Sequence, residues 1–336
     1  MPALRGQGGN RGIDSDPVTG VDFRPLGLVV GHATDAEGGT GVTVVRHAER
    51  QWRGGVAVLG RATGTRELLA TSPTSLADRV DAVMLTGGSA YGLDAAGGVM
   101  RWMEERGRGF SLGPVTVPIV PAAVIFDLLP TGRPDARPTA EMAYAACNSA
   151  TSVGIGEGSI GAGTGATVGK AGGREGAMKG GIGCWIELVG ELAVGAVALV
   201  NAFGDVRDGD GKILAGACDA DGRFLDSARL LAEGSTSRAA ESAGRNTTLA
   251  VVATNAALSR SGVQELAGAS SAALHHRITP AGTSYDGDVI FALCAHEGLS
   301  VPAIQVEALA VRALEMAIER AVRLAAGRDG VAGLAD

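Results

Sequence analysis

The residue of this chain best suited to nucleophilic chemistry is a threonine between a turn-forming segment and an apolar strand. Asn246-Thr247-Thr248 follows Gly244 and leads directly into the apolar residues 249–253. Cleavage of the Asn246–Thr247 bond would put a hydroxyl and a free α-amine on one residue. The reference pKa of an α-amine is about 7.7–8.0, so the amine is substantially unprotonated near pH 8 and can accept the hydroxyl proton. The sequence predicts self-cleavage at this bond, with Thr247 as the nucleophile.

Other nucleophilic and metal-dependent mechanisms have less support. The Gly-x-Ser-x-Gly elbow is absent, because the segment around Ser89 lacks the second glycine at the required position. The five histidines stand in no metal-ligand spacing, and we expect surface or packing roles for them: His32, His47, His275, His276 and His296. No metal and no cofactor is implied. A threonine that uses its own amine as base needs no histidine.

Two carboxylates form a second constellation, at Asp286 and Asp288, just before an apolar strand that starts at Val289. An Asp-Gly step is typical of a hairpin turn, in which both side chains would be solvated. Alternatively, the carboxylates converge at the end of the strand and orient the hydroxyl and ammonium of Thr247, since alternate residues of an extended chain face one side. The spacing favours neither interpretation.

Two candidate donors complete the set. Lys170 lies in a glycine-rich stretch, residues 154–183, that we interpret as a close-packed active-site loop. Asn201 ends an apolar strand, a position that suits an oxyanion-hole amide. Nucleotide binding is disfavoured: Gly156-x-Gly158-x-x-Gly161 has neither a strand before it nor a helix after it.

A second glycine-rich turn, Gly87-Gly88, joins a strand at residues 82–86 to a helix that ends before Gly107. Its backbone N–H groups either bind a carboxylate or oxyanion or simply form a tight turn. The two interpretations stay open.

Composition limits the function classes. The chain has 336 residues, 46% apolar and 19% charged, which suits a globular protein. A net charge of −7 argues against nucleic-acid binding. The four cysteines form no CxxC pair and are expected to be buried thiols in a reducing cytosol. No apolar signal region opens the chain, and the longest apolar run, residues 192–200, is too short to span a membrane. We therefore expect a cytoplasmic protein.

Strands and helices alternate along the chain, which predicts layered sheets with helices outside. The ordered part is expected to start at 26–31, and strands are expected at 42–45, 56–59, 82–86, 183–188, 192–200, 212–217, 249–255 and 289–293. Helices are expected up to residue 106 and at 139–147, 223–234, 261–276 and 303–326. We expect a disordered tail over residues 1–25 and a single catalytic domain over 26–336.

Several ordered motifs resemble the family of L-aminopeptidase/D-amino-acid esterases and β-peptidyl aminopeptidases, which includes the nylon-oligomer (6-aminohexanoate-oligomer) hydrolase. They are Val30-Gly-His-Ala-Thr-Asp35, Thr86-Gly-Gly-Ser-Ala-Tyr-Gly-Leu93, Pro121-Ala-Ala-Val-Ile-Phe-Asp127, Asn246-Thr-Thr248 and Val252-Ala-Thr-Asn255. The resemblance covers residues 26–326.

The resemblance implies an αββα sandwich of N-terminal-nucleophile type. It also implies autocleavage into an α chain, 1–246, and a β chain, 247–336, that stay together and assemble as a homotetramer of αβ units. The implied catalytic residues are Thr247, Asp286, Asp288, Lys170 and Asn201, with Tyr91 and Phe126 at the substrate pocket. The implied activity is hydrolysis of short peptides or 6-aminohexanoate-type amides through an acyl-enzyme.

The chain departs from parts of that family. β-Peptidyl aminopeptidases have a serine nucleophile and Ser-x-Glu, whereas this chain has Thr247 and Asp286-Gly-Asp288, like the nylon-oligomer hydrolase. Phe126 stands where that hydrolase has tyrosine, which removes a hydroxyl from the pocket. The alternatives are an ornithine acetyltransferase-like acyl transferase, which also self-cleaves before a threonine, and an uncleaved binding protein.

Overall fold

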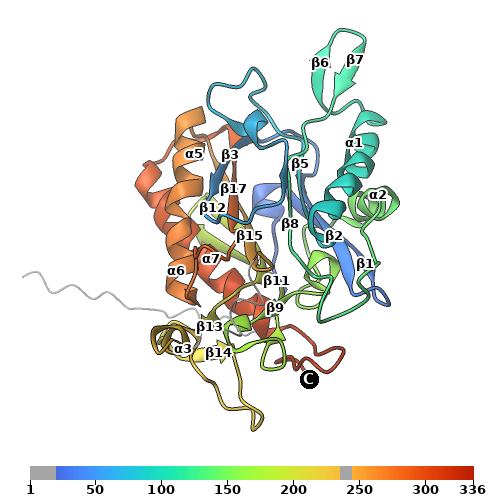
Figure 1. The fold of residues 1–336 in the computed structure, drawn as a ribbon. Helices are drawn as coiled ribbons and strands as arrows, with labels where there is room; N and C mark the ends of the chain where they lie inside the picture. The colour runs from blue at the N-terminus through green and yellow to red at the C-terminus, as the bar shows by residue number, and fades with distance from the viewer. Residues whose placement is uncertain (1–19, 235–243) are drawn as a thin grey trace, which may run out of the picture.

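Two five-stranded sheets pack face to face in the computed structural model, which describes residues 20–234 and 244–336 (Figure 1). The first sheet has the order β1 (Leu28–Asp35), β2 (Thr40–His47), β5 (Ala82–Thr86), β8 (Ala122–Val124) and β4 (Thr65–Arg66). The second has the order β11 (Gly181–Val189), β12 (Leu192–Asn201), β15 (Thr247–Ala256), β17 (Val289–Leu299) and β3 (Arg53–Val58). Neighbouring strands are antiparallel, except that β5 pairs with β8 and β15 with β17 in parallel.

Helices cover the outer face of each sheet. The first sheet carries α1 (Ala96–Glu104) and α2 (Ala140–Ser149); the second carries α5 (Arg260–Ala269), α6 (Ser271–Arg277) and α7 (Ala303–Arg323). The shorter elements are α3 (Ser227–Ala232), β6 (Phe110–Leu112), β7 (Val115–Val117), β9 (Thr167–Val168), β10 (Met178–Lys179), β13 (Asp205–Arg207), β14 (Ile213–Ala215) and β16 (Ile278–Thr279). The 3-10 turns are η1 (Arg24–Leu26), η2 (Leu68–Thr71), η3 (Ser89–Ala95), η4 (Gly161–Gly163) and η5 (Lys170–Gly172). The β6–β7 hairpin projects from the body (Figure 1).

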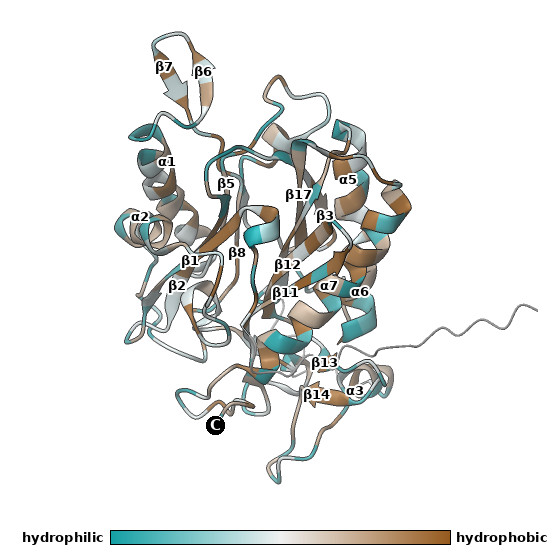
Figure 2. Cartoon of the chain, turned by 180° about the vertical axis from the view of Figure 1, so that it is seen from behind, coloured by the Kyte–Doolittle hydropathy of each residue, from teal (hydrophilic) through white to brown (hydrophobic). Residues whose placement is uncertain are grey.

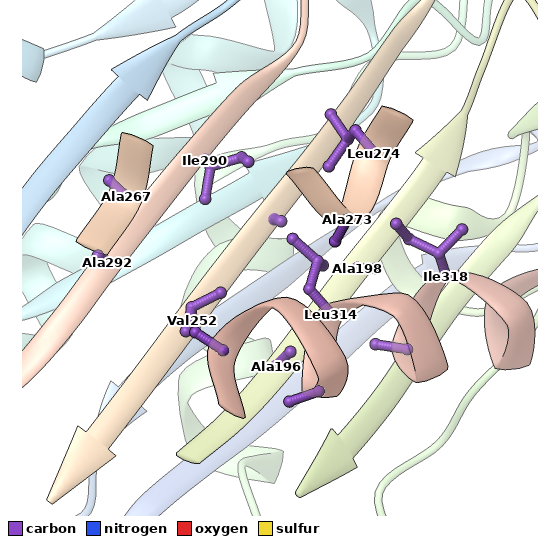
Figure 3. Close-up of a cluster of buried hydrophobic side chains, with 14 of the residues drawn as sticks. Ala196, Ala198, Val252, Ala267, Ala273, Leu274, Ile290, Ala292, Leu314 and Ile318 are labelled. Carbon is purple, nitrogen blue, oxygen red and sulfur yellow. The ribbon is translucent and has the colours of Figure 1, made fainter. Parts of the chain in front are cut away.

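Three apolar layers hold the sandwich together. One lies between the sheets, one between the first sheet and α1 and α2, and one between the second sheet and α5 to α7. All ten residues of β12 are buried, because sheet and helices cover its two faces. Figure 2 shows hydrophobic residues along the strands and hydrophilic ones on outward helix turns. In Figure 3, Leu314 and Ile318 of α7 lie over Ala196 and Ala198 of β12.

The four layers confirm the expected αββα sandwich. The apolar strands at 82–86, 183–188 and 192–200 correspond to β5, β11 and β12. The helix expected at 261–276 is two helices, because the chain turns at Ser270, whose hydroxyl donates to the carbonyl of Leu266. Several strands of two or three residues were not anticipated, since such short runs carry no periodicity. No helix in the described part of the chain is long and apolar enough to cross a membrane.

The start of the ordered chain needs a correction. The predicted disordered tail covered residues 1–25; of these, residues 1–19 lie outside the described residues. Val21 and Phe23 are buried between the sheets, and the amide of Phe23 donates to the carbonyl of Ser152. Residues 21–25 therefore belong to the folded domain, because an aromatic anchor outweighs the polar composition around it.

Close helix packing gives a first prediction. A Cβ on Gly183 of β11 would lie 2.0 Å from the carbonyl oxygen of Ala317 in α7, so Gly183→Ala must push the helix away. We expect a loss of about 1–3 kcal/mol in the free energy of unfolding, measured by denaturant titration. The control is Gly97→Ala in α1, where nothing lies within 4 Å of the added carbon. That variant should be neutral or stabilised by up to about 1 kcal/mol. Equal effects at both positions would contradict the packing argument.

Candidate active site

The predicted nucleophile lies at one end of the second sheet, on its central strand. Thr247 is the first residue of β15 and stands opposite Asn201, the last residue of β12. On the other side, β17 runs parallel to β15, so the Asp286-Gly287-Asp288 turn that precedes it lies beside Asn246 and Thr248. The strand register thus brings three distant segments of the sequence together.

The carbonyl oxygen of Asn246 belongs to the peptide bond that we expect to be cut, and two donors hold it. The amide of Gly287 donates to it at 2.8 Å, and the hydroxyl of Thr247 at 2.6 Å. Asn246 and Thr247 are both buried. An oxyanion hole consists of N–H groups that point at a carbonyl oxygen, so the Gly287 amide is placed as one of its donors.

Gly287 was not among the predicted site residues. A Cβ at this position would lie 2.4 Å from the carbonyl oxygen of Ala62 and 2.8 Å from the hydroxyl oxygen of Thr247. Only glycine therefore lets this backbone come so close to Thr247, the predicted nucleophile. The glycine between two acidic residues was the available signal, and it was interpreted only as a turn former.

The two acidic residues are buried rather than solvated, so the hairpin-cap interpretation is wrong. One oxygen of Asp288 accepts from the amide of Thr248 at 2.6 Å, and the other from Gly282 at 3.2 Å. Asp286 accepts from the amide and hydroxyl of Thr283 at 2.9 and 2.6 Å. The hydrogen bonds of both carboxylates thus come from backbone and hydroxyl donors, and one of these donors is the amide of Thr248, next to Thr247.

Burial sets the charge state of these carboxylates. Desolvation raises the pKa of Asp288 to about 7, and the neighbouring Asp286 carboxylate adds to the rise. Desolvation also raises the pKa of Asp286, against hydrogen bonds from Thr283. Both groups therefore hold protons at a higher pH than ordinary carboxyls.

Lys170 and Asn201 form one buried unit. The ammonium of Lys170 donates to the backbone and side-chain oxygens of Asn201, both at 2.9 Å, and to the carbonyl of Arg245 at 3.3 Å. The amide nitrogen of Asn201 also donates to the Arg245 carbonyl, at 3.1 Å. Desolvation lowers the pKa of Lys170 to about 7, against the attraction of Asp286. Both predicted donors thus hold the backbone two residues before Thr247.

The two predicted substrate residues differ in position. The backbone of Phe126 accepts from Asn201 at 3.4 Å, and its ring lies 5.4 Å below the guanidinium of Arg245, so Phe126 belongs to the cluster. Tyr91 lies on η3 with 63% of its surface exposed, and its ring packs under Arg137 at 4.5 Å. The described contacts do not join Tyr91 to Thr247.

The glycine-rich turn after β5 does bind a carboxylate, and the chain itself supplies it. The amide of Gly88 donates to Asp127 at 2.7 Å, and the hydroxyl of Thr40 donates to the other oxygen at 2.6 Å. A Cβ on Gly87 would lie 1.9 Å from that carboxylate. The turn is therefore filled from within and ties residues 87–88 to the segment that carries Phe126.

The chain is similar to several known proteins. The sequence profile described as Peptidase family S58 matches residues 25–333. An uncharacterized aminopeptidase of Mycobacterium tuberculosis is 42% identical over 256 residues, which cover 74% of this chain and 71% of the relative. A 6-aminohexanoate-oligomer endohydrolase of Kocuria sp. is 30% identical over 307 residues, which cover 88% of this chain and 82% of the relative.

Two solved structures share the fold. A β-aminopeptidase of Burkholderia sp. superposes with a TM-score of 0.66 at 19% identity, over 94% of this chain and 92% of that one. An L-aminopeptidase D-Ala-esterase/amidase from Ochrobactrum anthropi gives a TM-score of 0.63 at 18% identity, over 92% and 88%. The latter is described as a variant of the Ntn hydrolase fold. These similarities confirm the expected N-terminal-nucleophile type of the sandwich.

The buried carboxyl of Asp288 generates a prediction about pH. A carboxyl whose pKa is about 7 when folded, above its ordinary value of 3.8, binds its proton more tightly in the folded state. Its contribution to stability is full below about pH 4 and is lost as the pH rises to about 7. In a Thr247→Ala background, Asp288→Asn should therefore gain stability relative to its parent over that window, by at most about 4 kcal/mol.

Denaturant titrations at pH 4 to 8 measure this difference. Asp210→Asn, which removes an exposed carboxyl, controls for net charge. If the difference in the free energy of unfolding between Asp288→Asn and its parent does not change with pH, the pKa of Asp288 is not raised in the folded protein.

Proposed function

The chain belongs to Peptidase family S58, and on that basis we propose that it is a self-processing amide hydrolase whose nucleophile is Thr247. Family membership makes it a hydrolase of peptide bonds. The observation that carries the proposal is the environment of the Asn246–Thr247 bond. Its carbonyl oxygen accepts hydrogen bonds from Gly287 and from the Thr247 hydroxyl, in a buried site.

Maturation in this proposal is an intramolecular reaction. The Thr247 hydroxyl oxygen attacks the carbonyl carbon of Asn246, while the Gly287 amide stabilises the charge that develops on the carbonyl oxygen. The carbon–nitrogen bond breaks, the nitrogen takes up the hydroxyl proton, and an ester joins Asn246 to the side chain of Thr247. Water opens this ester, which leaves a carboxylate on Asn246 and restores the hydroxyl beside a free amine. The products are an α chain, 1–246, and a β chain, 247–336.

Turnover uses the donors that maturation releases. In the intact chain, Lys170 and Asn201 hold the carbonyl of Arg245, and Gly287 holds that of Asn246. When Arg245 and Asn246 leave the site after cleavage, the donor groups of Lys170, Asn201 and Gly287 become free to bind a substrate. The Thr247 hydroxyl then attacks the substrate amide with its own amine as base, and the amine of the leaving group departs with a proton. Water hydrolyses the acyl-enzyme.

The carboxylates position the nucleophile. Asp288 accepts from the amide of Thr248, which fixes the start of strand β15 just after Thr247. With a pKa of about 7, Asp288 exchanges a proton near neutrality, where a new ammonium on Thr247 would need a counter-charge, and burial raises the pKa of Asp286 as well. Their proposed role is to hold that ammonium and orient the hydroxyl.

The proposed substrates are short peptides and 6-aminohexanoate-type amides. Support comes from relatives named as an aminopeptidase and as a 6-aminohexanoate-oligomer endohydrolase. Phe126, beside Asn201, offers an apolar wall that suits an unbranched or apolar acyl group. We further propose a homotetramer of αβ units in the cytoplasm.

The first test is the intact mass of the purified protein under denaturing conditions. We expect two species, residues 1–246 and 247–336, from the native sequence. Thr247→Ala should remain a single chain without hydrolase activity, because it has no hydroxyl, whereas Thr247→Ser should still be cleaved. Hydrolysis of p-nitroanilides or 6-aminohexanoate oligomers by the folded alanine variant would remove Thr247 from the mechanism.

A second prediction concerns Asn201. Asn201→Ala should lower kcat about 10²- to 10³-fold with a smaller change in KM, because it removes a donor to the developing oxyanion. The matched control is Asn255→Ala at the opposite end of β15, whose side chain bonds only backbone groups of residues 191 and 193 among the described contacts. Equal losses in the two variants would assign Asn201 a purely structural role.

A further inference from the structure

A second buried lysine lies behind the site and takes no part in the chemistry described so far. Lys179 is 1% exposed and stands directly opposite Thr167 in the short β9–β10 pair. Its ammonium donates to the carbonyls of Thr164 at 2.8 Å and Ala166 at 2.7 Å. It forms no ion pair within the described residues. A lysine that is buried only to bond two carbonyls is costly, because burial removes its hydration.

The carbonyl of Ala166 and the amide of Thr167 are the two ends of one peptide group. The carbonyl end accepts from Lys179 and from the amide of Gly180 at 2.9 Å. The amide end donates to the side-chain oxygen of Asn201 at 3.0 Å. Hydrogen bonds at both ends of a peptide group polarise it and strengthen one another. Lys179 and Asn201 are thus connected through a single rigid plane.

This connection determines which way the amide of Asn201 faces. Its oxygen is held by Thr167 and Lys170, so its nitrogen must point at the Arg245 carbonyl. An amide whose oxygen has weaker partners can rotate and present its oxygen to the substrate, which would repel an oxyanion.

We propose that Lys179 is a positioning residue for the hydrolase: it holds the Ala166–Thr167 peptide toward Asn201 and thereby aims the Asn201 nitrogen at the acyl carbonyl. This inference rests on the proposed function for its catalytic consequence, but not for the hydrogen-bond chain itself. Lys179 and Asn201 both lie before the proposed cleavage site. The hydrogen bonds that connect them involve none of residues 244–247, so these bonds persist after maturation.

The electrostatic surroundings of Lys179 agree with this role. Burial lowers its pKa to about 7; Arg328 lowers the pKa further, whereas Asp127 and Asp329 raise it. The positive charge of Lys179 in turn lowers the pKa of Lys170.

Hydrogen exchange tests the positioning step independently of activity. In a Thr247→Ala background, Lys179→Met should speed exchange in peptides that cover residues 164–168, and leave exchange in α7 unchanged. The matched control, Arg277→Met, removes the half-buried cation that pairs with Glu315 and Glu319 between α6 and α7. That control should leave residues 164–168 protected. Unchanged exchange at residues 164–168 in folded Lys179→Met would overturn the proposal, whether or not the chain is an active hydrolase.

A double-mutant cycle tests the catalytic consequence. Lys179→Met in the otherwise native chain should lower kcat about ten- to a hundredfold with KM little changed, because a misplaced donor costs mainly transition-state binding. Lys179→Gln, which keeps a donor for one carbonyl, should lose less. Added to Asn201→Ala, Lys179→Met should cost no more than about twofold, since the group it positions is gone.

The outcomes separate cleanly. If Lys179→Met lowers kcat by the same factor in the native and Asn201→Ala backgrounds, Lys179 does not act through Asn201 and the proposal fails. For the control, the factor by which Arg277→Met changes kcat should be the same in the native and Asn201→Ala backgrounds, because Arg277 does not act through Asn201. An uncleaved and inactive native chain would refute the proposed function, while the exchange data would still decide whether Lys179 holds the peptide.

Discussion

The parallel pairing of β15 with β17 is the constraint on which the site depends. Leu249 pairs with Val289, and the bridge between Asn246 and Asp286 continues this register past the strand ends. The peptide that precedes Thr247 therefore meets the turn that precedes β17, and the Gly287 amide reaches the Asn246 carbonyl. A shift of one residue would turn the side chains of the turn to the opposite face. Because apolar layers bury both faces of the second sheet, such a shift is strongly disfavoured.

Glycine makes the close approaches in this fold possible. Gly183 lets α7 lie directly on β11, and Gly287 lets the acidic turn approach the carbonyl of Ala62. In both places the neighbouring atom is a backbone oxygen, which cannot move aside as a flexible side chain can. The high glycine content of the chain therefore reflects short distances between backbones at the sheet, the helix and the site.

The site concentrates ionisable groups that are expensive to bury. Lys170, Asp286 and Asp288 lie within one water-poor region, and desolvation moves their pKa values toward neutrality from both directions. Lys170 and Asp288, whose pKa values are about 7, exchange protons near neutral pH, which suits a reaction that creates an amine and a carboxylate from an amide. Asp127 and Lys179 are two further buried ionisable groups, bonded to the Gly88 amide and to the Ala166 carbonyl of the glycine-rich loop. The cost of burying these charges is offset by the three apolar layers around them.

The sequence by itself determined the layered arrangement of sheets and helices, its motifs indicated the αββα sandwich, and it supplied the candidate site residues that the strand register brings together. Apolar runs with polar ends marked the strands, and Thr247, Asp286, Asp288, Lys170 and Asn201 each stood where a strand or a glycine-rich turn meets such an end. These signals are local: each depends only on residues close together in the sequence, so it is visible without the tertiary structure.

Only the tertiary structure decided which groups touch. It placed the Gly287 amide on the Asn246 carbonyl, filled the Gly88 turn with Asp127, and joined Lys179 to Asn201 through one peptide group. It also buried Phe23, in the segment expected to be a tail. Backbone donors carry no side-chain identity, and their partners lie far away in the sequence. Strand register and helix packing, rather than residue type, decide such contacts.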